Sequence, residues 1–179
     1  SEDHRARESR RARALTLPLQ RGSIGAGSNP MRILAINCGS SSLKCSLVDT
    51  AGGPNLFDAR VENVGHGRAR LTVNHRAHSE VSAADQSAAM GIVLAELERL
   101  DARSRPEAVA HRIVHGGAAF TSPVVVSDEV LARITQLDSL APLHNPPALD
   151  ALRLARTRLA VPHVAVFDTA FHATLPPRA

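Results

Sequence analysis

Aromatic side chains are scarce in this sequence: its 179 residues include four phenylalanines and neither tryptophan nor tyrosine. Proteins that bind single-stranded nucleic acids stack the bases on aromatic rings, so four phenylalanines are too few to form a binding surface of this kind. Long apolar runs are also missing, because no segment approaches the roughly 18 residues that a membrane-spanning helix needs. The two cysteines, Cys38 and Cys45, match no zinc or redox motif by their spacing. We expect both thiols to be free and reduced, as in a cytosolic protein.

Lysine is nearly absent, because Lys44 is the only lysine among the 21 basic residues and all the others are arginines. The formal net charge of +4 points first towards a nucleic acid or another anionic partner. Residues 1–30, however, hold six arginines against three acidic residues, whereas residues 31–179 are nearly neutral. We therefore expect neither a nucleic acid nor a membrane as partner of the main part of the chain.

Residues 1–30 show no apolar periodicity and end in a loop composition, Gly25-Ala-Gly-Ser-Asn-Pro30. Their apolar stretch is too short and too broken for an export signal, and their acidic residues argue against a mitochondrial transit peptide. We interpret residues 1–30 as a disordered basic leader or a non-native extension. Met31 opens the first regular segment and is the expected natural start.

The remainder alternates between strand and helix patterns, and 44% of the chain is hydrophobic, which is enough for a sizeable core. The strands predicted by apolar runs cover residues 32–37, 43–48, 59–64, 68–74, 109–114 and 161–167. One helix is expected to begin at a Ser82 cap, a second spans 127–137 with a Ser127 cap, and a third begins at an Asn145 cap. The order predicts an α/β architecture in which helices flank a mixed sheet.

The segment Asn37-Cys-Gly-Ser-Ser-Ser-Leu-Lys44 joins the first two predicted strands. Gly39 allows a close backbone approach, and the hydroxyls, exposed N–H groups and Lys44 can all contact phosphate oxygens. The spacing is not that of a Walker A loop, because the second glycine and the following helix are missing. Taken alone, a serine-rich turn of this kind is more often an ordinary turn.

The segment His111-Arg-Ile-Val-His-Gly-Gly117 follows the next predicted strand and is dense in polar groups. Arg112 could grip a carboxylate or a phosphoryl group through two parallel hydrogen bonds. The two histidines lack the glutamate of a metalloprotease motif. We therefore favour structural roles for His111 and His115, as partners of loop backbone groups.

Two further polar residues occupy positions typical of sites. His144 lies in a proline-stiffened loop just before a helix, where an imidazole can contact an anion or complete the helix cap. Asp168 ends the most apolar predicted strand, and ligands of α/β sheets collect beyond the carboxyl ends of strands. Asp168 thus suits a magnesium ion or a general base, although it could equally cap the next turn.

Four segments together closely resemble the acetate kinase family, in the order of that family. They are Asn37-Cys-Gly-Ser-Ser-Ser-Leu-Lys44, His111-Arg-Ile-Val-His-Gly-Gly117, Asp138-Ser-Leu-Ala-Pro-Leu-His-Asn-Pro146 and Val164-Ala-Val-Phe-Asp-Thr-Ala-Phe-His172. The resemblance covers residues 31–179 and implies the N-terminal domain of a ribonuclease H-like, actin-like ATPase fold. It also implies a cytoplasmic enzyme that moves a phosphoryl group reversibly between ATP and acetate with Mg²⁺, as a homodimer when full length.

The resemblance assigns roles to this sequence position by position. The implied residues are, for catalysis, Asp168, His144 and Arg112; for substrate binding, Arg112, Val114 and Leu143; for the ATP phosphates, Ser40, Ser42 and Lys44; and for the metal, Asn37 and Asp168. Acetate is already ionised near neutral pH and hardly needs a general base. We therefore favour an electrostatic and metal-organising role for Asp168.

Members of this family are about twice as long as this chain, so we expect it to lack the C-terminal domain. We accordingly predict that residues 31–179 have no meaningful activity alone and leave apolar surface unburied. Two alternatives stay open: a propionate or butyrate kinase of the same family, and a non-catalytic fragment that acts as a binding or interaction domain. One methylene group changes discrimination only about 10–200-fold, so two visible pocket residues do not identify the acyl group.

Overall fold

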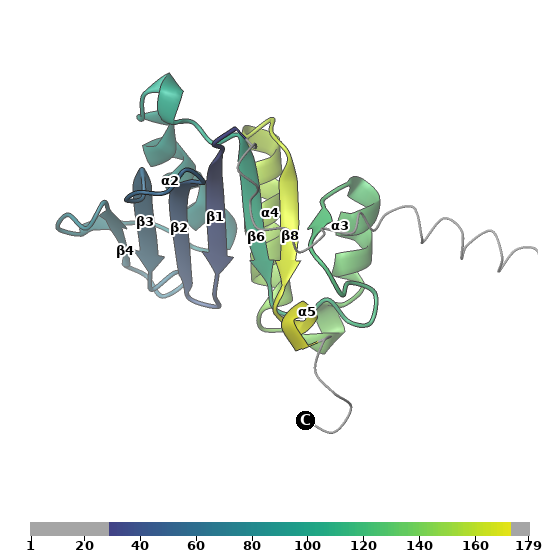
Figure 1. The fold of residues 1–179 in the computed structure, drawn as a ribbon. Coiled ribbons are helices and arrows are strands. Elements are labelled where there is room, and N and C mark those ends of the chain that lie inside the picture. The colour runs from purple at the N-terminus through teal and green to yellow at the C-terminus, as the bar shows by residue number, and fades with distance from the viewer. Residues whose placement is uncertain (1–28, 173–179) are drawn as a thin grey trace, which may run out of the picture.

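A computed structural model describes residues 29–172, which form an eight-stranded sheet in the order β5-β4-β3-β2-β1-β6-β8-β7 (Figure 1). The predicted extension at residues 1–30 lies outside the described residues, apart from its last two. The strands are β1 (Arg32–Cys38), β2 (Ser42–Asp49), β3 (Phe57–Glu62), β4 (Ala69–Val73), β5 (Ser79–Val81), β6 (Ala108–Ile113), β7 (Val124–Val125) and β8 (His163–Phe167).

The sheet has two parts that differ in strand direction. Strands β2 to β5, which we call the antiparallel wing, extend from β1 as consecutive antiparallel neighbours. Strands β1, β6 and β8, which we call the parallel centre, run in the same direction. The short strand β7 pairs antiparallel with β8 at the edge. The predicted mixed sheet is confirmed, whereas β5 and β7 are too short to show an apolar pattern in the sequence.

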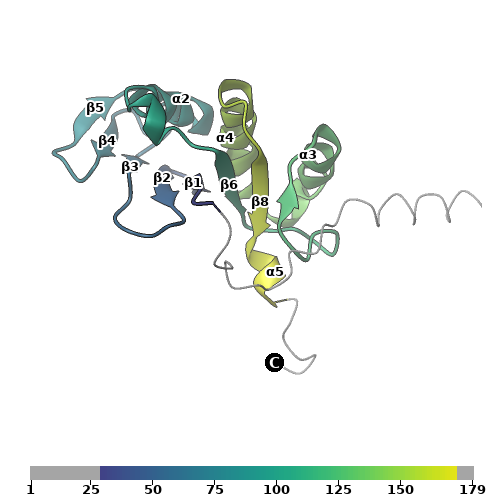
Figure 2. The same ribbon diagram turned by 45° about the horizontal axis from the view of Figure 1, so that its top comes forward.

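Helices cover one face of the sheet. The helices α2 (Gln86–Glu98) and α4 (Asn145–Arg158) pack against each other and against strands of both parts (Figures 1 and 2). The apolar residues predicted at helical spacing in α2 are buried: Met90, Val93, Leu94 and Leu97. Helix α3 (Asp128–Thr135) lies beside α4, and α5 (Asp168–His172) follows β8 directly. Two short 3-10 helices, Ala102–Ser104 and Asp138–Leu140, complete the described elements.

The predicted helix starts are right in one case and wrong in two. Ser127 caps α3, because its side chain accepts the Val130 N–H. Helix α2 is capped by Asp85 rather than Ser82: the Asp85 carboxylate accepts the Ala88 N–H at 2.7 Å, which fixes the start three residues later. Asn145 is not the cap of α4 but its first residue, and His144 occupies the cap position without a side-chain cap bond.

The core lies between the sheet and its helices. Alternate residues of β1 and β2, such as Leu34, Ile36, Leu43 and Leu47, are buried beneath α2 and α4. Cys38 and Cys45 belong to this core and are free, as predicted. Burial raises the pKa of the Cys38 thiol to about 12. No helix within residues 29–172 is long and apolar enough to cross a membrane.

The other face of the sheet is open in the described part of the chain. Residues that alternate with the core positions point to this open face, and those that are largely exposed there include Ala35, Lys44, Arg60, Arg70, Arg112 and Val166. Because paired residues on neighbouring strands share a face, Lys44, Asn37, Arg112 and Val166 form one row across it. The predicted site residues of three strands thus lie on one surface.

Candidate functional site

The candidate site lies where the strands of the parallel centre end. Their carboxyl ends meet at one edge of the sheet, which is the lower edge in Figure 1. Asn37 near the end of β1 pairs in register with Arg112 near the end of β6, and Asp168 is the first residue after β8. The structure therefore brings together three residues that the sequence predicts for catalysis and metal binding.

Arg112 and Asp168 form a two-pronged ion pair. The guanidinium donates from Nε to Oδ1 at 3.0 Å and from Nη2 to Oδ2 at 2.6 Å, which is the parallel fork that arginine and a carboxylate favour. The hydrogen bonds that Arg112 donates to Asp168 raise the pKa of Arg112; partial burial opposes this rise, and the nearby carboxylate charge adds to it. Arg112 is therefore held as a cation with a fixed orientation.

A third contact fixes the far side of the same guanidinium. Nη1 of Arg112 donates to the Oδ1 atom of Asn37 at 3.0 Å. A guanidinium has five N–H donors, so one N–H on each terminal nitrogen has no acceptor among residues 29–172. These two donors suit a second planar or tetrahedral anion, such as a carboxylate or a phosphoryl group.

Lys44 and the serines lie next to this group along β2. Lys44 pairs in register with Asn37, is exposed, and has no ion-pair or hydrogen-bond partner within the described range. Ser42 is the first residue of β2 and Ser40 is exposed in the turn that precedes it. The structure therefore presents the predicted phosphate-facing residues at the edge that also carries Arg112.

The three remaining predicted residues are on loops. The His144 side chain is exposed at the start of α4 and makes no hydrogen bond to the described residues. Val114 is half-buried just after β6, and Leu143 is 71% exposed. The assignment of Val114 and Leu143 to a substrate pocket, and that of His144 to catalysis, stay predictions.

Two residues that the sequence reasoning did not assign to the site fix its loops. The Asn145 side chain is completely buried and binds both backbone groups of His115, accepting its N–H at 3.2 Å and donating to its carbonyl at 3.1 Å. Thr169, next to Asp168, accepts the Gly116 N–H at 3.0 Å. The loop after β6 is thus attached to both α4 and α5. The sequence signal for both is their position beside a predicted site residue, since Asn145 follows His144 and Thr169 follows Asp168.

The two histidines of the second motif have structural roles, as expected. The His115 Nδ1 atom accepts the Gly117 N–H at 2.9 Å. His111 is buried and its partner is another histidine rather than a loop backbone group: Nε2 lies 2.9 Å from His163 Nδ1. Burial lowers the pKa of His111 to about 3, helped by the neighbouring His163 and by the positive charge of Arg156.

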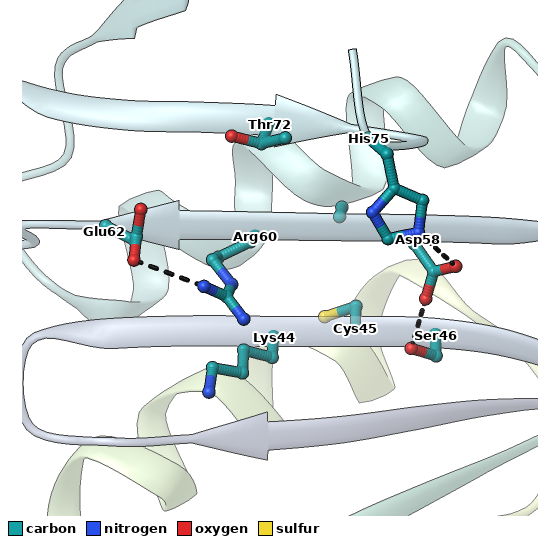
Figure 3. Close-up of a pocket in the computed structure, with 9 residues that line it drawn as sticks. Lys44, Cys45, Ser46, Asp58, Arg60, Glu62, Thr72 and His75 are labelled. Carbon is teal, nitrogen blue, oxygen red and sulfur yellow. Dashed lines mark hydrogen bonds and ion pairs between the residues drawn. The ribbon is translucent and has the colours of Figure 1, made fainter. Parts of the chain in front are cut away.

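Apart from the site at the strand ends, a hollow of about 330 Å³ lies on the open face over the antiparallel wing (Figure 3). It contains two cations, Lys44 and Arg60, and two carboxylates. Asp58 accepts a hydrogen bond from Ser46, and Glu62 lies 3.5 Å from Arg60. The charges of this hollow largely compensate each other, which distinguishes it from the edge that carries Arg112.

The donor set at the edge suits a magnesium ion. Asn37 and Asp168 supply one amide oxygen and one carboxylate, and both approach the same guanidinium. Mg²⁺ is commonly held by one or two carboxylates together with water and substrate phosphates rather than by a full protein cage. No cluster of three or more histidine, cysteine or acidic residues that could hold a metal occurs in the described part. The chemistry therefore fits a magnesium ion that is shared with a phosphate ligand.

Comparisons with known proteins identify the family of this chain. The profile of the acetokinase family matches residues 32–179. The acetate kinase of Deinococcus radiodurans is 43% identical over 150 residues, which cover 82% of this chain and 38% of the relative. The acetate kinase of Leifsonia xyli is 45% identical over 157 residues, with 82% of this chain and 39% of the relative covered. The chain therefore spans about two fifths of the length of these relatives.

Solved structures show the same fold. The acetate kinase of Porphyromonas gingivalis matches 83% of this chain and 40% of its own, with a TM-score of 0.72 and 32% identity. A propionate kinase from Francisella tularensis matches 83% of this chain and 39% of its own, with a TM-score of 0.72 and 30% identity. The expected actin-like α/β fold is thus confirmed, and the chain belongs to the acetokinase family.

Proposed function

We propose that this chain provides part of the active site of a kinase that forms acetyl phosphate from acetate and ATP. The observation that carries the proposal is the Arg112 guanidinium, which Asp168 and Asn37 hold in place while two of its donors have no partner among the described residues. An anion that develops or transfers beyond the strand ends would meet these donors directly.

The other predicted residues would share the negative charge of the ATP phosphates and of the transferred phosphoryl group. Lys44, the turn residue Ser40 and Ser42 at the start of β2 would contact the ATP phosphates, since they line the same edge and Lys44 has no partner in the described range. His144 would donate to the phosphoryl group, because its imidazole is exposed and uncommitted at the start of α4. Phosphoryl transfer needs mainly positioning and charge stabilisation, which these groups supply.

Asp168 and Asn37 would hold a magnesium ion, which would neutralise charge on the phosphates when bound. In the structure the Asp168 carboxylate is engaged by Arg112. This engagement supports an orienting and electrostatic role for Asp168 rather than proton abstraction. Acetate needs no base because it is already ionised at neutral pH.

A propionate kinase is the second candidate, because the propionate kinase from Francisella tularensis shares this fold with the same TM-score as the acetate kinase from Porphyromonas gingivalis. Val114 and Leu143 would form the wall that meets the acyl chain. The ratio of kcat/KM for acetate and propionate distinguishes the two candidates. Equal values would show that these walls do not select between them.

The whole enzyme needs more than this chain, so we propose that residues 31–179 are inactive alone. Acetyl phosphate formation by the purified 179-residue chain, trapped with hydroxylamine, would contradict this part of the proposal. A homodimer and a cytoplasmic location are further family-based proposals, which size measurement and cell fractionation of the complete protein would test.

The main test joins residues 31–179 to the remaining part of the Deinococcus radiodurans acetate kinase, in place of the part that this chain matches. We expect the folded chimera to form acetyl phosphate. Arg112→Lys should lower kcat/KM at least tenfold, because a lysine cannot bind two neighbours and an anion in one plane.

The matched control is Arg60→Lys in the antiparallel wing, which should leave kcat/KM within about twofold because the ion pair of Arg60 in the described part is an exposed one, with Glu62. A chimera with a normal melting transition and no activity would reject the proposed function. Equal effects of the two substitutions would reject the role of Arg112.

A further inference from the structure

The turn between β1 and β2, residues 39–41, exposes its backbone donors selectively. Among residues 29–172, the N–H groups of Ser40 and Ser41 have no acceptor, and both side chains are exposed. The turn lies at the carboxyl end of β1, which is the edge that also carries Arg112. Free N–H groups at such a place can bind the oxygens of an anion.

The carbonyl groups of the same turn are all engaged by other parts of the protein. The Gln86 side chain donates from Nε2 to the Gly39 carbonyl at 2.8 Å and to the Ser40 carbonyl at 3.3 Å. The Ser41 carbonyl accepts the Val64 N–H at 3.0 Å. Because a peptide group carries its N–H and C=O on opposite sides, holding the carbonyls inward turns the next N–H groups outward.

The Gln86 side chain holds these two carbonyl groups, and it makes no other hydrogen bond to the described residues. It is the first residue of α2, it is only 4% exposed, and its Oε1 atom is buried without a hydrogen-bond partner. A flipped amide would put Oε1 against two carbonyl oxygens, so the contacts fix which end of the side chain faces the turn. The buried amide therefore acts through its donors, and its acceptor is left unsatisfied.

We propose that Gln86 is a positioning residue for a phosphate site on the β1–β2 turn, in which the Ser40 and Ser41 N–H groups bind the phosphate chain of the nucleotide. This inference rests on the proposed kinase function and adds a buried residue, outside the predicted site, that controls it. Without the Gln86 donors, the Gly39 and Ser40 carbonyls are free to rotate outward. They would then repel the anion that the N–H groups attract.

The test uses the 179-residue chain and inorganic tripolyphosphate as the probe, followed by the backbone amide signals of Ser40 and Ser41 in ¹H–¹⁵N NMR spectra. In the wild-type chain these signals should shift saturably. Gln86→Met keeps the side-chain length without the donors, and we expect it to weaken the apparent affinity about tenfold. Gln136→Met is the matched control, since Gln136 is exposed at the end of α3, and should bind like the wild type.

A second measurement does not depend on the folding of a variant. In the wild-type chain the Gln86 side-chain Nε2 protons should shift together with the Ser40 and Ser41 amides, because the anion polarises the hydrogen bonds that connect them. The Gln136 side-chain signals should not move.

The outcomes separate the two proposals. If the wild-type amides shift but the Gln86 protons stay still, or if a folded Gln86→Met chain binds equally well, the role of Gln86 is rejected while the phosphate site stands. If tripolyphosphate moves neither serine amide in the wild-type chain, the phosphate site of the proposed kinase is rejected, and the positioning role is rejected with it.

Discussion

The antiparallel wing and the parallel centre handle their polar side chains in opposite ways. In the wing, partners are close in sequence: Asp58 binds Asn55 three residues away and Ser46 twelve residues away. In the centre, Arg112 binds Asn37 across 75 residues and Asp168 across 56. The charged residues of the wing that are paired have partners close in sequence, although Lys44 has none in the described range, whereas the centre gathers distant groups and leaves donors of Arg112 without a partner there.

This difference teaches where a site can form on this sheet. Local pairs on an antiparallel hairpin form as soon as the hairpin does and compensate each other, as around Asp58 and Arg60 (Figure 3). A group that needs β1, β6 and β8 in register exists only in the folded sheet. The distant contacts should therefore be the more sensitive ones. The first prediction below compares Asn145, which binds the loop after β6, with a residue of the wing; the second concerns the centre and the third the wing.

The largest expected effect compares two asparagines. Asn145→Ala leaves the partly buried N–H and carbonyl of His115 without their side-chain partner and should lower the free energy of unfolding by about 2–4 kcal/mol. Asn55→Ala removes an exposed amide that binds Asp58 and should lower it by less than about 1 kcal/mol. Urea unfolding of the two variants measures both values. Equal losses would mean that the wing depends on its polar contacts as much as the centre does.

The next effect is a loss of stability in acid that originates in the centre. Burial lowers the pKa of His111 to about 3. Between pH 6.5 and 3 this histidine is therefore protonated in the unfolded chain but neutral in the folded chain. This contribution to stability is present above the unfolded pKa of about 6.5 and is lost as the pH falls towards 3. Between pH 7.5 and 4.5 we expect the free energy of unfolding to fall by about 2–3 kcal/mol through this group.

The groups that face His111 have the same direction of effect. Burial also lowers the pKa of His163, against the opposing hydrogen bond to the Leu159 carbonyl, and the positive charge of Arg156 acts on both histidines. His111→Leu should flatten the acid slope in denaturant titrations, because it removes the buried group that takes up the proton on unfolding. A slope that persists unchanged in His111→Leu would place the acid sensitivity elsewhere.

The smallest effect belongs to an exposed ion pair of the wing. Arg68 lies 3.2 Å from Glu80, with 83% and 62% of their side chains exposed. Arg68→Ala should change the free energy of unfolding by less than about 0.5 kcal/mol, because solvent screens such pairs. Added salt should likewise change the difference in free energy of unfolding between the wild type and Arg68→Ala by less than about 0.5 kcal/mol. A loss above about 1 kcal/mol would show that charge pairing holds the wing together.

Local patterns in the sequence predicted the longer elements and the buried face of α2, but neither the short strands β5 and β7 nor which polar residues meet. The spacing of Met90, Val93, Leu94 and Leu97 identified the buried face of α2 because it depends only on helical geometry. Asp168 was predicted at the end of its strand for a similar reason. Its fork to Arg112 depends on the order of the strands in the sheet, which the sequence pattern leaves open.

Asn145 shows why the remaining residues were missed. An asparagine followed by a proline has the signature of a helix cap, and that local preference led to the wrong assignment. In the structure its amide instead binds the backbone of His115, 30 residues earlier, in the loop after β6. Gln86 likewise gives no sequence signal, because its partners are backbone carbonyls of a turn 46 and 47 residues away.

The three-sided hold on Arg112 has a thermodynamic consequence for any anion that binds there. A free arginine side chain loses about 2 kcal/mol of rotamer entropy when a ligand immobilises it. Here that ordering has taken place during folding, since Asp168 and Asn37 already fix the guanidinium plane. An incoming anion would therefore bind a guanidinium that is already ordered. Its binding free energy would not be reduced by the entropy cost of ordering that side chain.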